Sequence, residues 1–154
     1  MKSPRIQKDI IDATAIETTT TIVSDIGGEL FSILVDEARD ISVEEQMVVA
    51  LRFVDREGSV IECIIGIKHV ADTSSLSLKA AIESLFFRHE LSISSLGGQC
   101  YDGASNMQGE LNGLKSLILK ENESAFYVHC FAHKLQLTLV AIAENHKKIC
   151  SFFN

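Results

Sequence analysis

A change in hydrophobic pattern near residue 70 limits the folds that this chain can adopt. The first part of the chain carries three short apolar runs, the second of them rich in β-branched residues, which predict strands. These predicted strands cover residues 30–35, 46–54 and 59–67. The turn sequence Asp55–Gly58 predicts a hairpin between the last two, because Gly58 can adopt a positive φ.

Beyond residue 70, helical spacing alternates with two further strand-like runs, near 96–101 and 125–130. One predicted helix has Leu78, Ile82, Leu85 and Phe86 on one face, with Ser75 or Ser77 as its cap. The next is defined by Met107, Leu111, Leu114 and Ile118. The last runs from about His133 to Cys150, with Leu135, Leu139 and Ile142 along one side. A helix over residues 5 to about 24, stopped by Gly27 and Gly28, precedes the strands.

This element order predicts an α/β fold in which a mixed sheet is flanked by helices. It is the element order of the ribonuclease H-like fold, incomplete at the C-terminus. We expect residues 1–28 to form a helical lead-in and residues 29–154 to form a partial ribonuclease H-like core.

Two aspartates are expected at one edge of this sheet. Asp36 is predicted to end the first strand, and Asp102 follows the fourth. If these strands are parallel neighbours, the two carboxylates converge where ligands usually bind, as a Mg²⁺ pair requires for phosphodiester chemistry. The alternatives are a turn or cap role for Asp102 and, for Asp36, a solvated run of charged residues.

The residues after Asp102 form an unusually small turn. Gly103 leaves room for a substrate backbone to approach closely. Asn106 has two interpretations, a cap for the following helix or a hydrogen bond to phosphate, and the cap is favoured.

Cys130 and His133 are three residues apart at a strand-to-helix junction. A CxxH pair could supply two zinc ligands, although two more would be needed at a matching spacing. The spacing alone favours a buried cysteine and an orienting or capping histidine.

Composition excludes several classes of protein. The net charge of −7 does not favour a strong nucleic-acid binder, although clustered metal-binding carboxylates are themselves acidic. The four cysteines form no CxxC pair and are expected to be thiols in a reducing compartment. Neither a signal peptide nor an apolar run long enough for a bilayer is present, so we expect an intracellular protein with no membrane partner. The serine-hydrolase, Walker A and dinucleotide motifs are absent.

Three segments resemble one family in the correct order: "LFSILVDEARDIS", "CYDGASNMQGELNGLKSLI" and "YVHCFAHKLQLTLV". The chain resembles hAT-superfamily transposase-like proteins, in the branch of MYM-type and TTF-type zinc finger proteins with a domain of unknown function. The resemblance implies a ribonuclease H-like core with an Asp-Asp-Glu triad and a divalent metal, Mg²⁺ or Mn²⁺. Asp36 and Asp102 match the two aspartates. Cys130 and His133 match a CxxH linked to handling of the DNA end, which makes zinc unlikely.

The chain also departs from this family. The third acid of the family lies further downstream, and Glu144, in the last predicted helix, is a poor substitute. We therefore expect a fragment or domesticated remnant of a transposase core, nuclear by resemblance and inactive alone. The alternative is a non-catalytic nuclear interaction domain. The broad apolar surface of the last helix could bind a protein partner or a second copy, although packing of that helix on the sheet is favoured.

Overall fold

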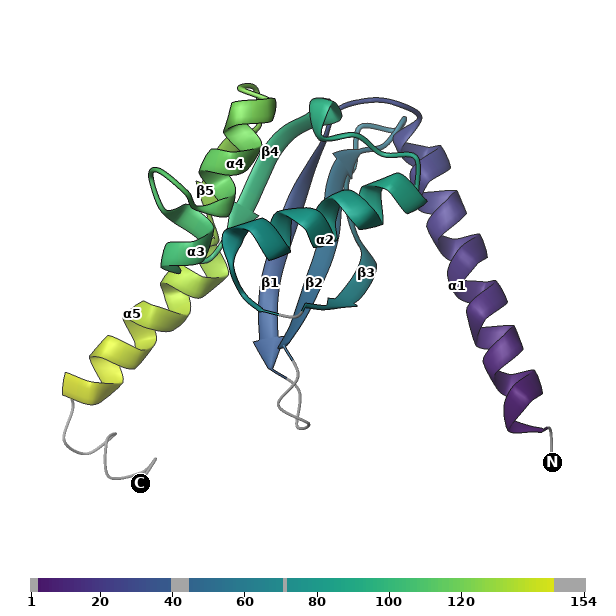
Figure 1. The fold of residues 1–154 in the computed structure, drawn as a ribbon, viewed down its shortest axis with the longest axis horizontal. Coiled ribbons are helices and arrows are strands. Elements are labelled where there is room, and N and C mark those ends of the chain that lie inside the picture. Colours follow the sequence, from purple (N-terminus) through teal and green to yellow (C-terminus); the bar gives the residue numbers. More distant parts are fainter. Residues whose placement is uncertain (1–2, 40–44, 71, 146–154) are drawn as a thin grey trace.

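The structure, a computed structural model, describes residues 3–39, 45–70 and 72–145 of the 154-residue chain. Its centre is a five-stranded sheet with strand order β3-β2-β1-β4-β5 (Figure 1). The strands are β1 (Phe31–Arg39), β2 (Glu45–Val54), β3 (Val60–His69), β4 (Leu96–Tyr101) and β5 (Phe126–His129). β1, β2 and β3 are antiparallel neighbours, whereas β4 is parallel to both β1 and β5.

The helices are α1 (Pro4–Ile26), α2 (Ser75–Arg88), α3 (Ser105–Gln108), α4 (Leu114–Glu121) and α5 (Phe131–Asn145). A short 3₁₀ turn, η1 (Ile93–Ser95), precedes β4. The predicted mixed sheet flanked by helices is therefore confirmed. The division of the chain into a helical lead-in over residues 1–28 and a core over residues 29–154 stays a prediction. None of the helices in the described ranges is long and apolar enough to cross a bilayer.

The hydrophobic core lies between one face of the sheet and helices α2 and α4, which lie in front of the sheet in Figure 1. Alternate residues of β1 and β2 point into it, as expected for a strand with one buried face. The helical face predicted for α2 is buried, at Leu78, Ile82, Leu85 and Phe86. Burial of these four side chains contributes on the order of 1.5–3 kcal/mol each.

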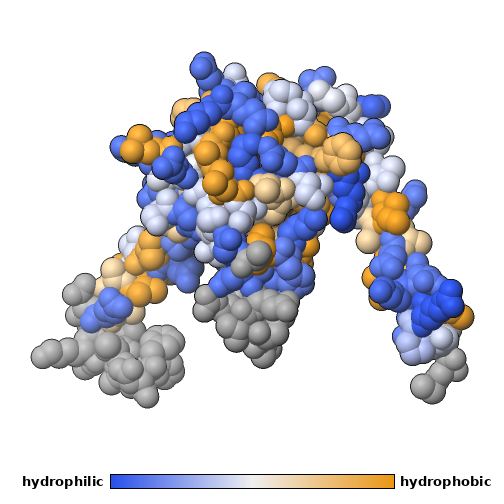
Figure 2. Space-filling view, in the orientation of Figure 1, coloured by the Kyte–Doolittle hydropathy of each residue, from blue (hydrophilic) through white to orange (hydrophobic). Residues whose placement is uncertain are grey.

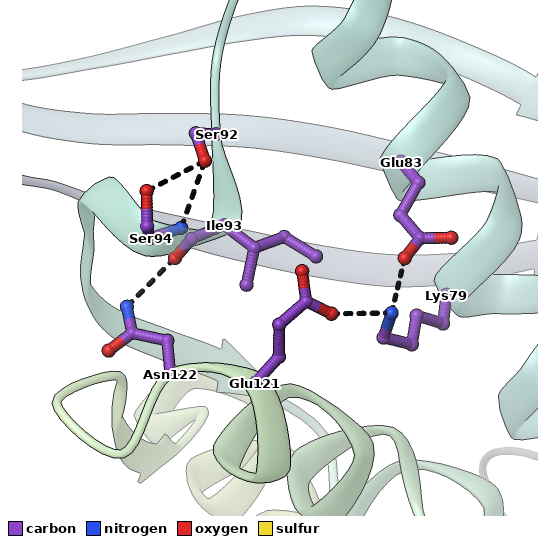
Figure 3. Close-up of polar contacts among 7 residues, drawn as sticks. All are labelled: Lys79, Glu83, Ser92, Ile93, Ser94, Glu121 and Asn122. Atoms are coloured by element: carbon purple, nitrogen blue, oxygen red, sulfur yellow. Dashed lines mark hydrogen bonds and ion pairs between the residues drawn. The ribbon is translucent and has the colours of Figure 1, made fainter.

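Polar contacts fasten the edge of this core (Figure 3). The Lys79 ammonium of α2 bridges Glu83 on its own helix and Glu121 of α4, the latter at 2.8 Å. The Asn122 amide donates to the carbonyl of Ile93 at 2.8 Å and to that of Leu96 at 2.9 Å. These contacts fix α4 and η1 at the start of β4.

Three local predictions need correction. β1 does not end at Asp36 but continues to Arg39, because residues 37–39 still pair with β2. α2 is capped by neither Ser75 nor Ser77: the Ser74 hydroxyl accepts a hydrogen bond from the Ser77 amide. The last helix begins earlier than predicted, at Phe131, and the predicted segment 146–150 lies outside the described residues.

The helix predicted through Met107, Leu111, Leu114 and Ile118 is two short helices, α3 and α4, and Leu111 is 79% exposed. The chain between them folds back so tightly that a Cβ on Gly113 would lie 2.3 Å from the Gly109 nitrogen. Glycine at both positions allows this contact, and it breaks the helical repeat.

The other face of the sheet is only partly covered. Register places Ile64, Ala50, Leu34, Cys100 and Val128 side by side across all five strands on this face. We call it the open face. Helices α1 and α5 project outward at the two ends of the molecule (Figure 1). The prediction that the last helix packs on the sheet is wrong, because its large apolar side chains are exposed.

Candidate functional site

The parallel pairing of β1 with β4 brings the two predicted aspartates together. Leu34 is the register partner of Cys100, and Asp36 and Asp102 each follow two residues later. Because strand side chains alternate with a period of two, both carboxylates belong to the open face, at the same end of the sheet. They line one cavity of ≈ 370 Å³. This volume falls within the range of small-molecule sites.

Cys130 and His133 line the same cavity, from the junction of β5 and α5. The Cys130 amide donates to the Tyr101 carbonyl at 2.8 Å, which holds the start of α5 against β4. Gln136, one turn along the helix from His133, also faces the cavity. Four residues predicted separately from the sequence therefore surround one space.

The carboxylate of Asp102 also stabilises its own turn. Its Oδ1 accepts a hydrogen bond from the Ala104 amide at 3.1 Å, in the pattern of an Asx turn. The Tyr127 hydroxyl donates to the Asp102 backbone carbonyl at 3.2 Å. Burial, with the charges of Cys100 and Asp102, raises the pKa of Tyr127 and keeps this donor protonated. Asp102 therefore both stabilises its own turn and lines the cavity.

Asn106 does not cap a helix. Ala104 occupies the cap position of α3, and Asn106 lies inside that helix. Its amide instead donates to Glu37 Oε1 at 2.9 Å and to the Thr73 carbonyl at 2.8 Å. A cap residue precedes its helix and accepts a hydrogen bond from a backbone amide, whereas Asn106 lies within α3 and its side-chain amide donates to two other segments, so the cap prediction is wrong.

Glu37 is a carboxylate that sequence reasoning missed. Burial raises its pKa, as do the charges of Asp102, Glu45 and Asp36, whereas the hydrogen bond from Asn106 opposes the shift. Its position beside Asp36 in a strand already placed it on the opposite face. The alternation of side chains in a strand could therefore have indicated where Glu37 lies, but only the fold shows that Asn106 hydrogen-bonds to it.

The space beside Gly103 is filled by this chain rather than left for a substrate. A Cβ on Gly103 would lie 2.8 Å from His129 Cε1. The His129 ring also stacks on His133, with centroids 6.1 Å apart. His129 Nε2 is buried and has no hydrogen-bond partner among the described residues. On this side, Gly103 accommodates the histidine.

The cysteines that the structure describes are free thiols, and two of them, Cys100 and Cys130, line the cavity. Cys63, Cys100 and Cys130 are half-buried and unbridged, and Cys150 lies outside the described residues. Burial raises the pKa of Cys100, and its contact with the Cys130 thiol raises it further. Cys100 was also missed, although it lies two residues before Asp102 and so shares its face. Within the described ranges, no three His, Cys, Asp or Glu side chains are grouped to hold a metal ion.

The chemistry available here is that of two hard carboxylates that line a partly apolar cavity. Mg²⁺ is commonly held by one or two carboxylates, with water and substrate phosphates as the remaining ligands, so this donor set fits the ion. Glu62 also lines the cavity. Arg52, the register partner of Glu62 on β2, forms an ion pair with the Glu62 carboxylate, with Nη2 and Oε2 2.6 Å apart.

The five-stranded mixed sheet flanked by helices is consistent with a ribonuclease-like α/β domain. The chain belongs to the DUF4371 family, described as the ZMYM1/FAM200 RNase-like domain, whose family model matches residues 1–113. Asp36 and Asp102 fall inside the matched range, and Cys130 and His133 fall beyond it.

A human protein, the "52 kDa repressor of the inhibitor of the protein kinase", is 28% identical to the chain over 156 residues. The aligned region covers 95% of this chain but 20% of that relative, so the chain spans about one fifth of its length.

Proposed function

We propose that this chain is a nucleic-acid-binding domain descended from the catalytic core of a hAT-like DNA transposase. The proposal rests on the position of Asp36, within β1, and Asp102, just after the parallel strand β4, at one cavity. Family membership supports a nucleic-acid-related role. The name of the human relative, a repressor, supports a nuclear location.

In this proposal, Asp36 and Asp102 hold Mg²⁺ or Mn²⁺, which would bridge to phosphate oxygens of the nucleic acid. Cys130 and His133 form the wall past which a DNA end would pass. The domain does not cleave DNA by itself. Among the described residues that line the cavity, the third carboxylate is Glu62, and it is paired with Arg52.

Metal binding is tested by titrating Mn²⁺ into the protein and following the paramagnetic broadening of its NMR signals. We expect broadening around Asp36 and Asp102, and its loss in Asp36→Asn and Asp102→Asn. Asp12→Asn, which removes the same charge from the exposed surface of α1, is the matched control. Equal broadening in all three variants would remove the support for a specific site.

DNA binding and cleavage are measured on the same variants, with labelled duplexes in Mg²⁺ and in Mn²⁺. We expect metal-dependent binding without cleavage above the buffer control. Robust cleavage that Asp102→Asn abolishes would show that the domain is an active enzyme, contrary to the proposal.

A second candidate function is a non-catalytic nuclear domain that binds protein. The exposed apolar surface of α5 favours it, because isolated exposed side chains are ordinary but a contiguous set marks an interaction site. The two functions are compatible, since they use different surfaces.

A further inference from the structure

The turn that carries Asp102 is held by side-chain donors from two other elements. The Tyr127 hydroxyl of β5 donates to the Asp102 carbonyl at 3.2 Å, and the Gln108 amide of α3 donates to the Gly103 carbonyl at 2.8 Å. Both elements belong to the body of the domain, unlike the projecting helix α5, whose apolar side chains Figure 2 shows. Two successive carbonyls of the turn are therefore held by side chains.

The side chain of Tyr127 is itself restrained. Its ring contacts that of Tyr101, with the two centroids 5.7 Å apart. The Lys115 ammonium of α4 lies over the Tyr127 ring, 5.0 Å from its centroid, where a cation is attracted to the aromatic face. The hydroxyl is therefore presented to Asp102 from a ring that two neighbours hold in place.

Tyr127 acts on Asp102 from the face opposite the cavity. The next residue, Val128, is paired with Cys100 on the open face, so Tyr127 points to the other face, where it packs against the core. The described residues that line the cavity do not include Tyr127. A change at the Tyr127 hydroxyl therefore reaches the cavity through Asp102.

The peptide between Asp102 and Gly103 influences where the Asp102 carboxylate lies. Rotation of this peptide changes ψ of Asp102, and a glycine at the next position resists that rotation less than another residue would. The hydrogen bond from Tyr127 opposes the rotation at the Asp102 carbonyl. The carboxylate is bonded within the same turn to the Ala104 amide at 3.1 Å, so its position depends on the turn staying closed.

We propose that Tyr127 is a positioning residue for Asp102, because its hydroxyl holds the peptide that keeps the carboxylate directed at the cavity. This inference rests on the proposed function, in which Asp36 and Asp102 hold a divalent metal ion. Hydrogen bonds from beyond the ligands orient the ligands and tune the affinity of a metal site. Tyr127 supplies such a bond from the core side of the sheet.

The test compares two variants that each lose one tyrosine hydroxyl. Tyr127→Phe removes the donor to Asp102. Tyr101→Phe is the matched control, because its ring contacts Tyr127 but its hydroxyl donates to Gln99 in the core. Circular dichroism shows that each variant keeps its fold, and urea unfolding gives the stability of each.

Mn²⁺ is titrated into each 154-residue protein and followed by the paramagnetic broadening of its NMR signals. We expect Tyr127→Phe to bind Mn²⁺ about tenfold more weakly than the wild type, as the loss of a partner beyond the ligands costs other metal sites. Tyr101→Phe should bind Mn²⁺ as the wild type does, even where it lowers stability. A purely structural role for Tyr127 would lower stability without this loss of affinity.

Amide hydrogen exchange of the metal-free protein gives a second readout. The Ala104 amide donates to the Asp102 carboxylate, so its exchange rate reports how firmly that carboxylate is held. Loss of one neutral hydrogen bond should speed this exchange about two- to tenfold in Tyr127→Phe. Tyr101→Phe should leave it unchanged.

Unchanged Mn²⁺ affinity or unchanged Ala104 exchange in Tyr127→Phe would overturn the inference, as would an equal loss of affinity in Tyr101→Phe. A wild type that binds no Mn²⁺ at Asp36 and Asp102 would instead overturn the proposed function. The Ala104 exchange rate then decides by itself whether Tyr127 positions Asp102, since it needs no metal.

Discussion

Replacing Asn106 with leucine should loosen the junction between β1, α3 and the entry to α2. The amide of Asn106 donates to a carboxylate, Glu37, at 2.9 Å and to a backbone carbonyl, that of Thr73, at 2.8 Å. A hydrogen bond to a charged group contributes about 1.5–3 kcal/mol and a neutral one about 0.5–1.5 kcal/mol. Because the site is half-buried, water recovers part of this, and we expect a loss of about 2–3 kcal/mol.

The assay is urea unfolding followed by circular dichroism, with the free energy of unfolding extrapolated to water. Asn112→Leu, in the exposed loop between α3 and α4, is the matched control and should change stability by less than about 0.5 kcal/mol. Asn106→Asp should be worse than Asn106→Leu at neutral pH, since it sets a second negative charge against Glu37. Acidification should reduce that difference, because protonation of either carboxyl removes the repulsion.

Equal stability of Asn106→Leu and Asn112→Leu would refute the reasoning. The result would mean that the two hydrogen bonds contribute nothing measurable. Asn106 would then be available for other work, such as the phosphate contact considered from the sequence.

Three further predictions concern the same region. Glu37→Gln should be more stable than the wild type at neutral pH, because folding raises the pKa of Glu37 and the ionised carboxyl therefore costs stability there. The gain in the free energy of unfolding should vanish as the pH falls below the unfolded pKa near 4.5. A gain that does not depend on pH in urea unfolding would contradict this. Gly103→Ala should lower the free energy of unfolding by about 1–3 kcal/mol in the same measurement, because the added Cβ would lie 2.8 Å from His129. Gly97→Ala is the control and should lose less, because the nearest atom to its added Cβ is 3.7 Å away. Cys100 should react with iodoacetamide more slowly in the folded than in the unfolded protein at pH 8, because folding raises its pKa and lowers the thiolate fraction; equal rates by mass spectrometry would count against it.

Local sequence patterns predicted the elements with strong periodicity. The face of α2 and the boundaries of β4 were predicted correctly, because apolar spacing reports burial directly. Patterns failed where backbone contacts override spacing. The helix through Leu111 is broken by the close approach of Gly109 and Gly113, and β1 continues past Asp36 because β2 supplies partners.

The candidate site shows the same division. Asp36 and Asp102 were identified from their predicted positions at strand ends, and Cys130 with His133 from their spacing. Their shared cavity depends on which strands are neighbours, and a sequence pattern does not report strand order. Glu37 and His129 were missed because their importance comes from Asn106 and Gly103, each distant in sequence.

The sequence by itself therefore determined the element types, the hydrophobic core and the residues with chemistry to offer, since these follow from local spacing and side-chain type. Only the tertiary structure decided that β1 and β4 are parallel neighbours and that Asn106 hydrogen-bonds Glu37 and Thr73 rather than capping α3. It also decided that α5 projects with its large apolar side chains exposed. Each of these depends on contacts between residues far apart in the chain. Such contacts form only when the whole sheet assembles.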